Sequence, residues 1–365
     1  MGVLDGIRIV EVASSPATSV CGMMLADLGA DVILIDPPGK DGAGPRPTEI
    51  YNRGKRSIVL DLNQHDCVQT LLQLVQQSDI VLEGGGPGLA EVLGYGPDIC
   101  LAKKPSLVFG RSSGFGQNGP AAMNASSGGI STAVSGALWM ETAPDETPLP
   151  RADLLGVVGG GALYLAIGVL AALLRAREDG GGQVVDSSML EGSAHMFNLL
   201  VVMLEERGSF DMLRPDAFGC YALRSYQCAD GEWINLSAIE PRFHTLLLER
   251  LGLADDAEFC AGLQDREKWP VLAKRFEQLF ANRPRDEWCG LLSGDDTCFA
   301  PILAPEEAAR HPHGLARHLY DVVDGVLQVS AAPRFSATPS APTARVPRRD
   351  EHRSEILATL PRSKE

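Results

Sequence analysis

Residues 7–110 alternate short apolar runs with longer amphipathic stretches, and this alternation limits the possible fold more than any other feature of the chain. Strands are predicted at the apolar runs 7–12, 31–35, 57–61, 79–83 and 107–110. Helices are predicted between them, at 19–28 and 66–77. A strand, a helix and a second strand within about thirty residues form a parallel pair with a right-handed crossover. The sequence therefore predicts an α/β fold built on a doubly wound parallel sheet.

The length of the chain predicts two domains or one elaborated domain. At 365 residues it exceeds the usual size of a single domain. We expect a large α/β domain at 1–200, to which the C-terminal residues 315–365 return, and a smaller α+β domain at 215–315. A hairpin turn is predicted at 226–231, and the Pro- and Ala-rich residues 330–349 are expected to lie extended over the surface.

Two segments of the large domain bear on a ligand site. Residues 114–136 are rich in Gly, Ser and Asn, so they are expected to form a loop that crosses a ligand cleft. A long apolar helix is predicted from Val157 to about Arg177. Its most apolar part, 162–174, is too short to span a bilayer, so no membrane association is expected.

The composition limits the kinds of partner and the cellular compartment that are expected. A formal net charge of −15 argues against nucleic acid as a partner. The N-terminus has no basic run followed by an apolar stretch, so no signal peptide is expected. The eight cysteines form no C-x-x-C pair, which favours a reduced, cytoplasmic protein. His311, His313 and His318 have no further ligands at metal-binding spacing, so no metal site is expected.

Several motifs, in order along the chain, resemble those of one protein family. They are LDGIRIVE at 4–11, NRGKRSIVLDL at 52–62, GFGQNGP at 114–120, GQVVD at 182–186 and AIEPRF at 238–243. Each motif is modest alone, but together they extend over most of the chain. The chain resembles the family III CoA-transferases (CaiB/BaiF), and among them the α-methylacyl-CoA racemase branch. This resemblance implies a Rossmann-like large domain, a smaller domain and an interlocked homodimer.

The resemblance also implies catalytic residues that this chain lacks. In the racemase branch a histidine and an aspartate abstract and return the α-proton of an acyl-CoA thioester from opposite faces of an enolate. Aligned on the Gly-Pro pair at 119–120, the histidine position falls at Ser127 and the aspartate position at Val157. Neither side chain is a base at neutral pH. The valine also removes the carboxylate that transferases acylate.

Three residues remain as candidates for catalysis. Glu240 matches the glutamate that orients the family histidine, and it is either a base or a structural hydrogen-bond acceptor. Asp153 precedes Val157 by four residues and either enters the same pocket or caps or precedes the following helix, and the second is the preferred interpretation. Ser127, with the loop to Gly129, is a candidate donor to the thioester oxygen.

CoA is expected to bind as part of the substrate, with no tightly bound cofactor. The resemblance implies contacts to it from Arg53, Lys55, Arg56, Leu60, Gly84, Gly86 and Gln117. The three cations either hold the 3′-phosphate or form a solvated basic loop, and the glycine run offers backbone N–H groups. Gly86 stands where the racemase branch carries a phosphate-binding arginine, and a second basic position falls at Pro37. An acyl carrier protein in place of CoA therefore stays open.

We expect an enzyme that acts on an acyl thioester or a related carboxylic substrate by α-proton chemistry: epimerisation, isomerisation or elimination with non-standard residues. Two alternatives remain open. One is CoA transfer between carboxylic acids, and the other is a catalytically silent member that binds a ligand or a partner protein. Two histidines are weighed as well: His195 is expected to be packed, and His244, one helical turn beyond Glu240, is expected to be exposed.

Overall fold

A computed structural model describes residues 2–12, 15–39, 49–143, 145–150, 153–210, 219–294, 296–339 and 343–361. The chain forms two compact units. The larger unit comprises Met1–Glu141, Thr147–Glu205 and His318–Glu365, and the smaller unit comprises Thr142–Glu146 and Glu206–Arg317. The sequence placed the corresponding boundaries at 200, 215 and 315.

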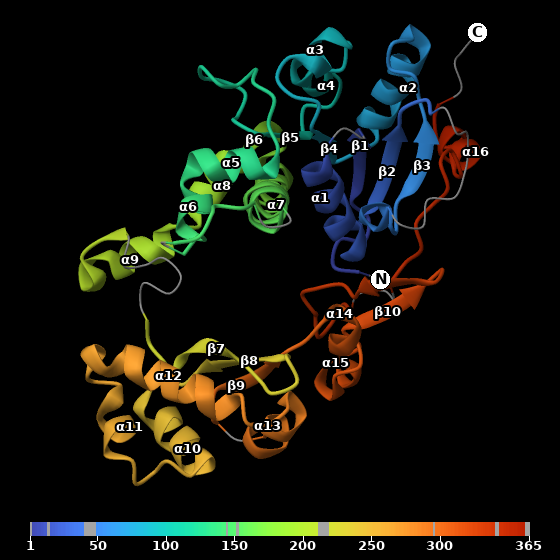
Figure 1. Cartoon of the computed structure of the whole chain (residues 1–365). Coiled ribbons are helices and arrows are strands. Elements are labelled where there is room, and N and C mark those ends of the chain that lie inside the picture. Colours follow the sequence, from blue (N-terminus) through green and yellow to red (C-terminus); the bar gives the residue numbers. More distant parts are fainter. Residues whose placement is uncertain are drawn as a thin grey trace. The chain divides into compact units, whose positions relative to one another are not determined.

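A six-stranded parallel sheet forms the centre of the larger unit (Figure 1). Its strands are β1 (Arg8–Val12), β2 (Asp31–Asp36), β3 (Arg56–Val59), β4 (Ile80–Glu83), β5 (Val108–Ser113) and β6 (Gln183–Ser188). They lie in the order β3-β2-β1-β4-β5-β6, so the strand order reverses between β1 and β4. Parallel strands all end at one edge of the sheet, and ligands of such folds bind outside that carboxyl edge at the point of reversal. The predicted α/β fold is confirmed.

Helices cover both faces of this sheet. Its strand residues alternate between two cores: Val10, Ile33 and Phe109 pack on one face with α2, whereas Ile9 and Val108 pack on the other with α1 and α7. The helices of the larger unit are α1 (Pro16–Asp27), α2 (His65–Gln76), α3 (Leu89–Val92), α4 (Pro97–Lys103), α5 (Gly128–Ser135), α6 (Ala137–Met140), α7 (Tyr164–Asp179), α8 (Met189–His195), α9 (Asn198–Arg207, which ends just inside the smaller unit) and α16 (Arg353–Ala358). Such two-sided burial explains the apolar runs of the central strands β1, β2 and β4.

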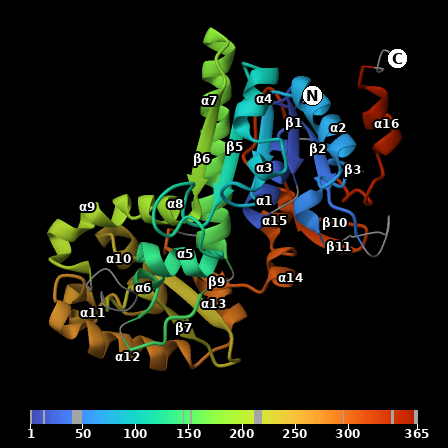
Figure 2. The same cartoon turned by 90° about the horizontal axis from the view of Figure 1, so that it is seen from above.

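The apolar helix predicted to begin at Val157 is longer than expected. It starts as a π-helix over Leu154–Leu163 and continues as α7 beside β5 and β6 (Figure 2). At 26 residues, Leu154–Asp179 is the one helix in the described part of the chain with the length and composition to cross a membrane. The expectation that the apolar run is too short was therefore wrong. More than half of its most apolar window is buried against the sheet and α8, which is the packing of a core helix.

The segment 114–136 is only partly a loop. Its second half forms α5, because the Ser127 side chain accepts a hydrogen bond from the backbone N–H of Ile130 and so caps the helix. The prediction of a continuous loop was wrong over Gly128–Ser135. Ser127 thereby lies at the start of a helix and not within a flexible segment.

The C-terminal residues return to the free edge of β3. We call residues 349–353 the C-terminal strap. The backbone N–H of Val59 donates to Asp350 Oδ1 at 2.8 Å, the N–H of Ser57 to His352 Nδ1 at 3.2 Å, and the N–H of His352 to the Ser57 carbonyl at 3.0 Å. The strap therefore pairs with backbone N–H and C=O groups of β3 that would otherwise be unpaired at the edge of the sheet. Two antiparallel strands, β10 (Tyr320–Val323) and β11 (Val326–Val329), precede it in this unit.

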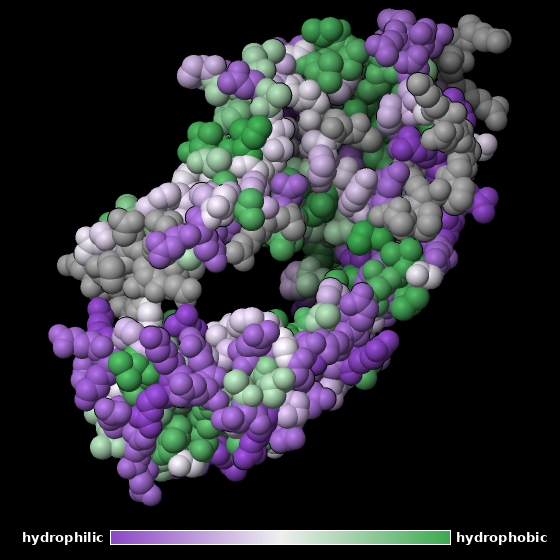
Figure 3. Space-filling view, in the orientation of Figure 1, coloured by the Kyte–Doolittle hydropathy of each residue, from purple (hydrophilic) through white to green (hydrophobic). Residues whose placement is uncertain are grey.

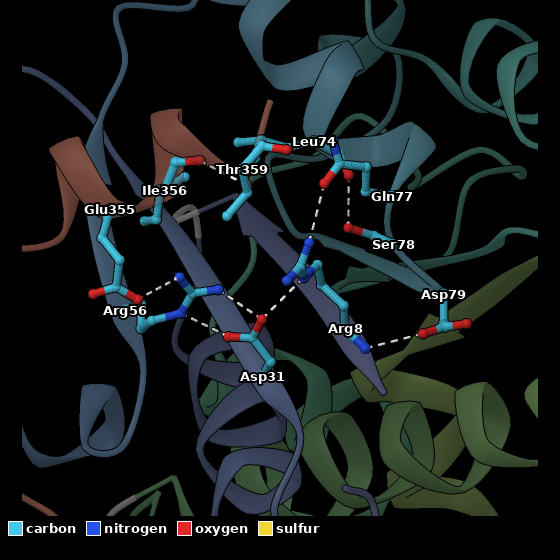
Figure 4. Close-up of polar contacts among 10 residues, drawn as sticks. All are labelled: Arg8, Asp31, Arg56, Leu74, Gln77, Ser78, Asp79, Glu355, Ile356 and Thr359. Atoms are coloured by element: carbon cyan, nitrogen blue, oxygen red, sulfur yellow. Dashed lines mark hydrogen bonds and ion pairs between the residues drawn. The ribbon is translucent and has the colours of Figure 1, made fainter. Parts of the chain in front are cut away.

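A polar network fixes α16 at the amino edge of the sheet, where the parallel strands begin (Figure 4). Asp31 accepts from the guanidinium groups of both Arg8 (2.9 Å) and Arg56 (2.6 Å). Arg56 also contacts Glu355 of α16 at 3.0 Å, and Gln77 donates to the Thr359 carbonyl at 3.1 Å. Burial raises the pKa of Asp31, but hydrogen bonds and positive charge from Arg56 and Arg8 outweigh it and hold that pKa below its usual value.

The smaller unit is an α+β assembly around an aromatic core. An antiparallel sheet of β7 (Leu223–Gln227), β8 (Trp233–Ser237) and β9 (Phe299–Ile302) packs against its helices. These are α10 (Pro241–Leu251), α11 (Ala257–Gly262), a 3₁₀ turn (Arg266–Lys268), α12 (Trp269–Phe280), α13 (Arg285–Leu292), α14 (Pro305–Ala308) and α15 (Pro312–Ala316). Its centre is a cluster of interlocking rings, with Phe259 and Phe276 stacked at 4.6 Å.

Candidate functional site

Two pockets adjoin at the carboxyl edge of the sheet in the larger unit. The first, which we call the serine pocket, has a volume of about 400 Å³ and lies where β4 and β5 end. The hydroxyl-bearing residues Ser15, Ser112, Ser113 and Ser126 line it, together with the glycine run 84–86. Ser112 Oγ is buried and has no hydrogen-bond partner within the described protein, so a donor or acceptor is available to a ligand. The pocket suits a polar, uncharged group.

The second pocket, which we call the Arg349 pocket, has a volume of about 270 Å³ and shares Ser15 with the first. It lies where β1 and β2 end. Asp36, Tyr51, Asn52 and Arg349 are among its lining residues. Ser15 lines both pockets, so they adjoin near the point where the strand order reverses.

The structure brings three predicted site positions together. A Cβ atom built on Gly128 would lie 2.3 Å from Asp153 Oδ1 and 2.9 Å from Val157 Cγ2. Gly128 is the first residue after Ser127, whose neighbour Ser126 lines the serine pocket. The Asp153 carboxylate therefore reaches the N-terminal end of α5, beside Ser127 and Val157.

Asp153 occupies the N-cap position of the π-helix but does not cap it through its side chain. It precedes the π-helix with a left-handed backbone (φ 53°), and its side chain makes no capping hydrogen bond. Its carbonyl instead accepts from the N–H groups of Val157 (2.9 Å) and Val158 (3.2 Å), the second bond being of the π type. The preferred interpretation, that Asp153 caps or precedes the following helix, is thus confirmed for its position, although its side chain makes no capping bond. The side chain is exposed, whereas Val157 is buried at 8% exposure.

Glu240 lies in the smaller unit, at the start of α10. Its carboxylate is 60% exposed, lies 3.4 Å from the Arg242 guanidinium and makes no capping hydrogen bond. Its role in catalysis stays a prediction.

The two weighed histidines differ from expectation. His244 is buried at 4% exposure, and its Nε2 lies 2.7 Å from the Tyr221 hydroxyl, so the expectation of an exposed residue was wrong. Burial lowers the pKa of His244. His195 is exposed rather than packed, and its Nδ1 lies 2.8 Å from the Tyr164 hydroxyl.

The cations expected at phosphate are all engaged in ion pairs. Arg53 forms a two-point pair with Asp27 at 2.6 and 3.0 Å, and Lys55 lies 2.7 Å from Glu11 with both side chains fully buried. Arg56 belongs to the network at the amino edge of the sheet. Contact with a phosphate requires each of them to leave a short ion pair, which is most costly for the buried lysine.

Of the other residues predicted to contact CoA, two line the serine pocket, one lies in the core, and Gln117 is bonded to Asp186 through its backbone. Gly84 and Gly86 line the serine pocket. Leu60 is 3% exposed and packs in the core of the sheet with α2. The backbone N–H of Gln117 donates to Asp186 Oδ2 at 2.9 Å.

A buried acid supports the glycine run. Glu83 accepts a short hydrogen bond from the backbone N–H of Gly85, and Arg111 lies 3.5 Å from it while pairing with Glu91 at 2.7 Å. Burial raises the pKa of Glu83, although the Gly85 N–H and Arg111 oppose this rise. The network fixes the loop after β4 and thereby one wall of the serine pocket. Among the described residues no three His, Cys, Asp or Glu side chains gather to hold a metal ion.

The doubly wound sheet, with adjoining pockets at its point of reversal, defines an α/β protein whose candidate ligand site lies at the carboxyl edge of the sheet. More specifically, the chain belongs to CoA-transferase family III, whose profile matches residues 4–353. α-Methylacyl-CoA racemase of Mus musculus is 36% identical over 361 residues, covering 97% of this chain and 92% of that protein. The racemase of Homo sapiens is 35% identical over 370 residues, covering 99% and 94%.

A solved structure shares the fold. A CAIB/BAIF family protein from Brucella suis superposes with a TM-score of 0.84 at 24% identity, covering 99% of this chain and 100% of that chain. CoA-transferases match the sequence at lower identity than the two racemases do. The family predicted from the motifs is confirmed, and these identities favour its racemase-like branch.

Proposed function

We propose that the protein binds an acyl-CoA thioester across the two pockets and exchanges the proton on the carbon next to the thioester carbonyl. The observation that carries this proposal is the identity of 36% to an α-methylacyl-CoA racemase over nearly the whole chain. CoA enters as part of the substrate, and no other cofactor is required. The serine pocket supports the assignment because its uncharged hydroxyl groups suit the amides and carbonyl of a pantetheine thioester.

Chemistry in the larger unit depends on Asp153 and Ser127. The proposal takes Ser127 and Val157 to occupy the positions of the family histidine and aspartate. Asp153 accepts the α-proton and returns it, while the electron pair of the broken C–H bond moves into the enolate. The Ser127 hydroxyl and the positive end of α5 stabilise the enolate oxygen. The contact of Asp153 with Gly128 supports this pairing, because it brings acid and hydroxyl to one helix end.

Glu240 is the second candidate base. Inversion of configuration requires a second group that delivers a proton to the opposite face of the enolate, and Glu240 has an exposed carboxyl group that can carry that proton. Its contribution is tested separately from that of Asp153.

We also propose a cytoplasmic homodimer. Apolar side chains form patches on the surface (Figure 3). Helices of the larger unit have several exposed apolar side chains. These include Val134 (63%), Ile167 (64%), Leu174 (73%), Leu199 (73%) and Val202 (76%). A contiguous apolar patch on a protein surface is typical of an interface. A second copy is the proposed occupant, and Val202→Lys should shift the mass measured by analytical ultracentrifugation to that of one chain.

The test of the reaction is deuterium incorporation at the α-carbon of a 2-methylacyl-CoA in D₂O. The unaltered chain should catalyse incorporation. Asp153→Asn should lose at least about ten-fold in rate, and Glu240→Gln should also lose rate if it is the second base. Both variants should retain binding of the thioester.

Other outcomes point to other functions. Binding without exchange in the unaltered chain would reject the proposal and favour a silent, ligand-binding protein. Movement of labelled CoA to a second carboxylic acid, without exchange, would favour a CoA-transferase. Activity with an acyl carrier protein thioester but not with CoA would change the substrate class.

A further inference from the structure

The C-terminal strap carries an arginine to the carboxyl edge of the sheet. Arg349 lines the Arg349 pocket although it is far in sequence from every other residue there. Asp350, the next residue, is held by β3: its backbone N–H donates to Ser57 Oγ at 3.0 Å, and its Oδ1 accepts from Val59 N–H at 2.8 Å. Ser57 in turn donates to Asp36 Oδ2 at 2.6 Å. The strap and the pocket wall are therefore one hydrogen-bonded structure.

Arg349 is loosely paired, in contrast to the three cations at 53–56. Its guanidinium lies 3.6 Å from Glu49 Oε1, beyond the 2.7–2.9 Å of a charge-assisted hydrogen bond. Its side chain is 31% exposed. Exchange of Glu49 for a phosphate oxygen at Arg349 therefore costs far less than opening the buried Lys55–Glu11 pair.

The charges of the pocket favour a nucleoside that carries a single phosphate nearby. One arginine and two carboxylates, Asp36 and Glu49, are among its lining residues. A pyrophosphate would be repelled by the two acids. Ribose hydroxyl and base amino groups are donors and fit them, and an acid at the end of the second strand of a doubly wound sheet commonly accepts from a ribose hydroxyl. Tyr51 offers a ring at the same wall.

We propose that Arg349 is the residue that recognises the 3′-phosphate of CoA, with Asp36 accepting from the adjacent ribose hydroxyl. This assignment rests on the proposed binding of an acyl-CoA thioester and adds the residue that reads its nucleotide end. The arginine acts from the C-terminal strap, and the bonds of Asp350 to β3 fix its position.

The experiment compares CoA with 3′-dephospho-CoA by isothermal titration calorimetry. The unaltered chain should bind CoA about ten-fold more tightly, as expected for one charge-assisted contact at a partly exposed site. Arg349→Gln should bind both forms with the weaker affinity and so lose the discrimination. Arg349→Lys should retain part of it, because the charge remains without the planar fork. Arg348→Gln is the matched control: it removes the same charge from the adjacent, exposed residue and should discriminate like the unaltered chain.

Three results would overturn the assignment. Unchanged discrimination in Arg349→Gln is the first, and equal loss in Arg348→Gln is the second. The third is equal affinity of the unaltered chain for the two CoA forms while deuterium exchange proceeds, which would leave the proposed function standing. Failure of the unaltered chain both to bind CoA and to exchange the α-proton would remove the proposed function and Arg349's role together. Thermal unfolding of each variant separates these results from misfolding.

Discussion

At the scale of single residues, the ion pair of Lys55 and Glu11 places two charged groups in the interior of the larger unit. Lys55 Nζ lies 2.7 Å from Glu11 and also donates to the Ser19 carbonyl (2.9 Å) and to Asn52 Oδ1 (3.2 Å), with both charged side chains fully buried. Burial raises the pKa of Glu11, and the charge of Lys55 opposes that rise. Removal of one partner leaves the other as an unpaired buried charge.

We therefore expect Lys55→Met to lower the free energy of unfolding by about 3–5 kcal/mol. The double variant Glu11→Leu with Lys55→Met should recover much of that loss, because no charge then remains buried. Urea denaturation followed by circular dichroism measures both. Arg175→Met is the control, since its pair with Asp179 is exposed and its loss should change stability far less. A small loss in Lys55→Met would show that the pair is hydrated.

A second residue-scale contact lies where α5 meets the π-helix. A Cβ on Gly156 would lie 2.5–2.7 Å from backbone atoms of Gly128, whereas a Cβ on Gly128 would meet the Asp153 and Val157 side chains. We expect Gly156→Ala to lower stability by about 1–3 kcal/mol, because backbone cannot yield as a side chain can. Gly128→Ala should destabilise less but slow deuterium exchange by displacing Asp153. Equal effects of the two variants on both measurements would contradict this.

At the scale of elements, the sequence predicted the strands well and the helices around the site poorly. Apolar runs bounded by turn residues marked β1, β2 and β4 within one or two residues. α5 was missed because its Gly- and Ser-rich composition indicates a loop, and only the Ser127 cap and packing against the π-helix and α8 make it helical. The π-helix has no composition signal of its own, since it depends on which carbonyl each N–H reaches. The conformations of α5 and of the π-helix therefore depend on contacts between elements, which the local sequence does not report.

The helix α10 illustrates a further element-scale consequence, because His244 anchors it to Tyr221 inside the smaller unit. Burial lowers the pKa of His244 in the folded chain. Below a pH of about 6.5 the unfolded chain binds the proton first, so stability falls, by up to about 1.4 kcal/mol per pH unit. His244→Gln should flatten this part of the pH dependence. The measurement is urea unfolding at pH 7.5 and 5.5, with Trp269 and Trp288 of the smaller unit as reporters. An identical slope in both proteins would refute it.

At the scale of the whole molecule, motif order along the chain was sufficient to predict the family, and the glycine run and Ser127 could be found from it. Arg349 could not. Its segment is Pro- and Ala-rich and predicts an extended tail, and Asp350 and Ser57, which position it, are 293 residues apart in sequence. Periodicity and motif spacing report on neighbours along the chain, whereas this contact depends on the return of the C-terminus to the edge of the sheet.

That return leads to a prediction about binding that is separate from catalysis. Asp350→Ala removes the acceptor for Val59 N–H. It also places alanine in a left-handed backbone conformation (φ 62°), which alanine adopts less readily than aspartate. We expect the KM for an acyl-CoA to rise several-fold with kcat nearly unchanged, because Arg349 loses its support while Asp153 and Ser127 do not. Asp350→Asn keeps an acceptor oxygen and tolerates the same backbone, so it should behave nearly as the unaltered chain.

Glu355→Gln is a second control: it loosens α16, which follows the strap, at the amino edge of the sheet, and it should leave KM unchanged. A fall in kcat alone in Asp350→Ala would mean that the strap acts on the reacting centre and not on the nucleotide end.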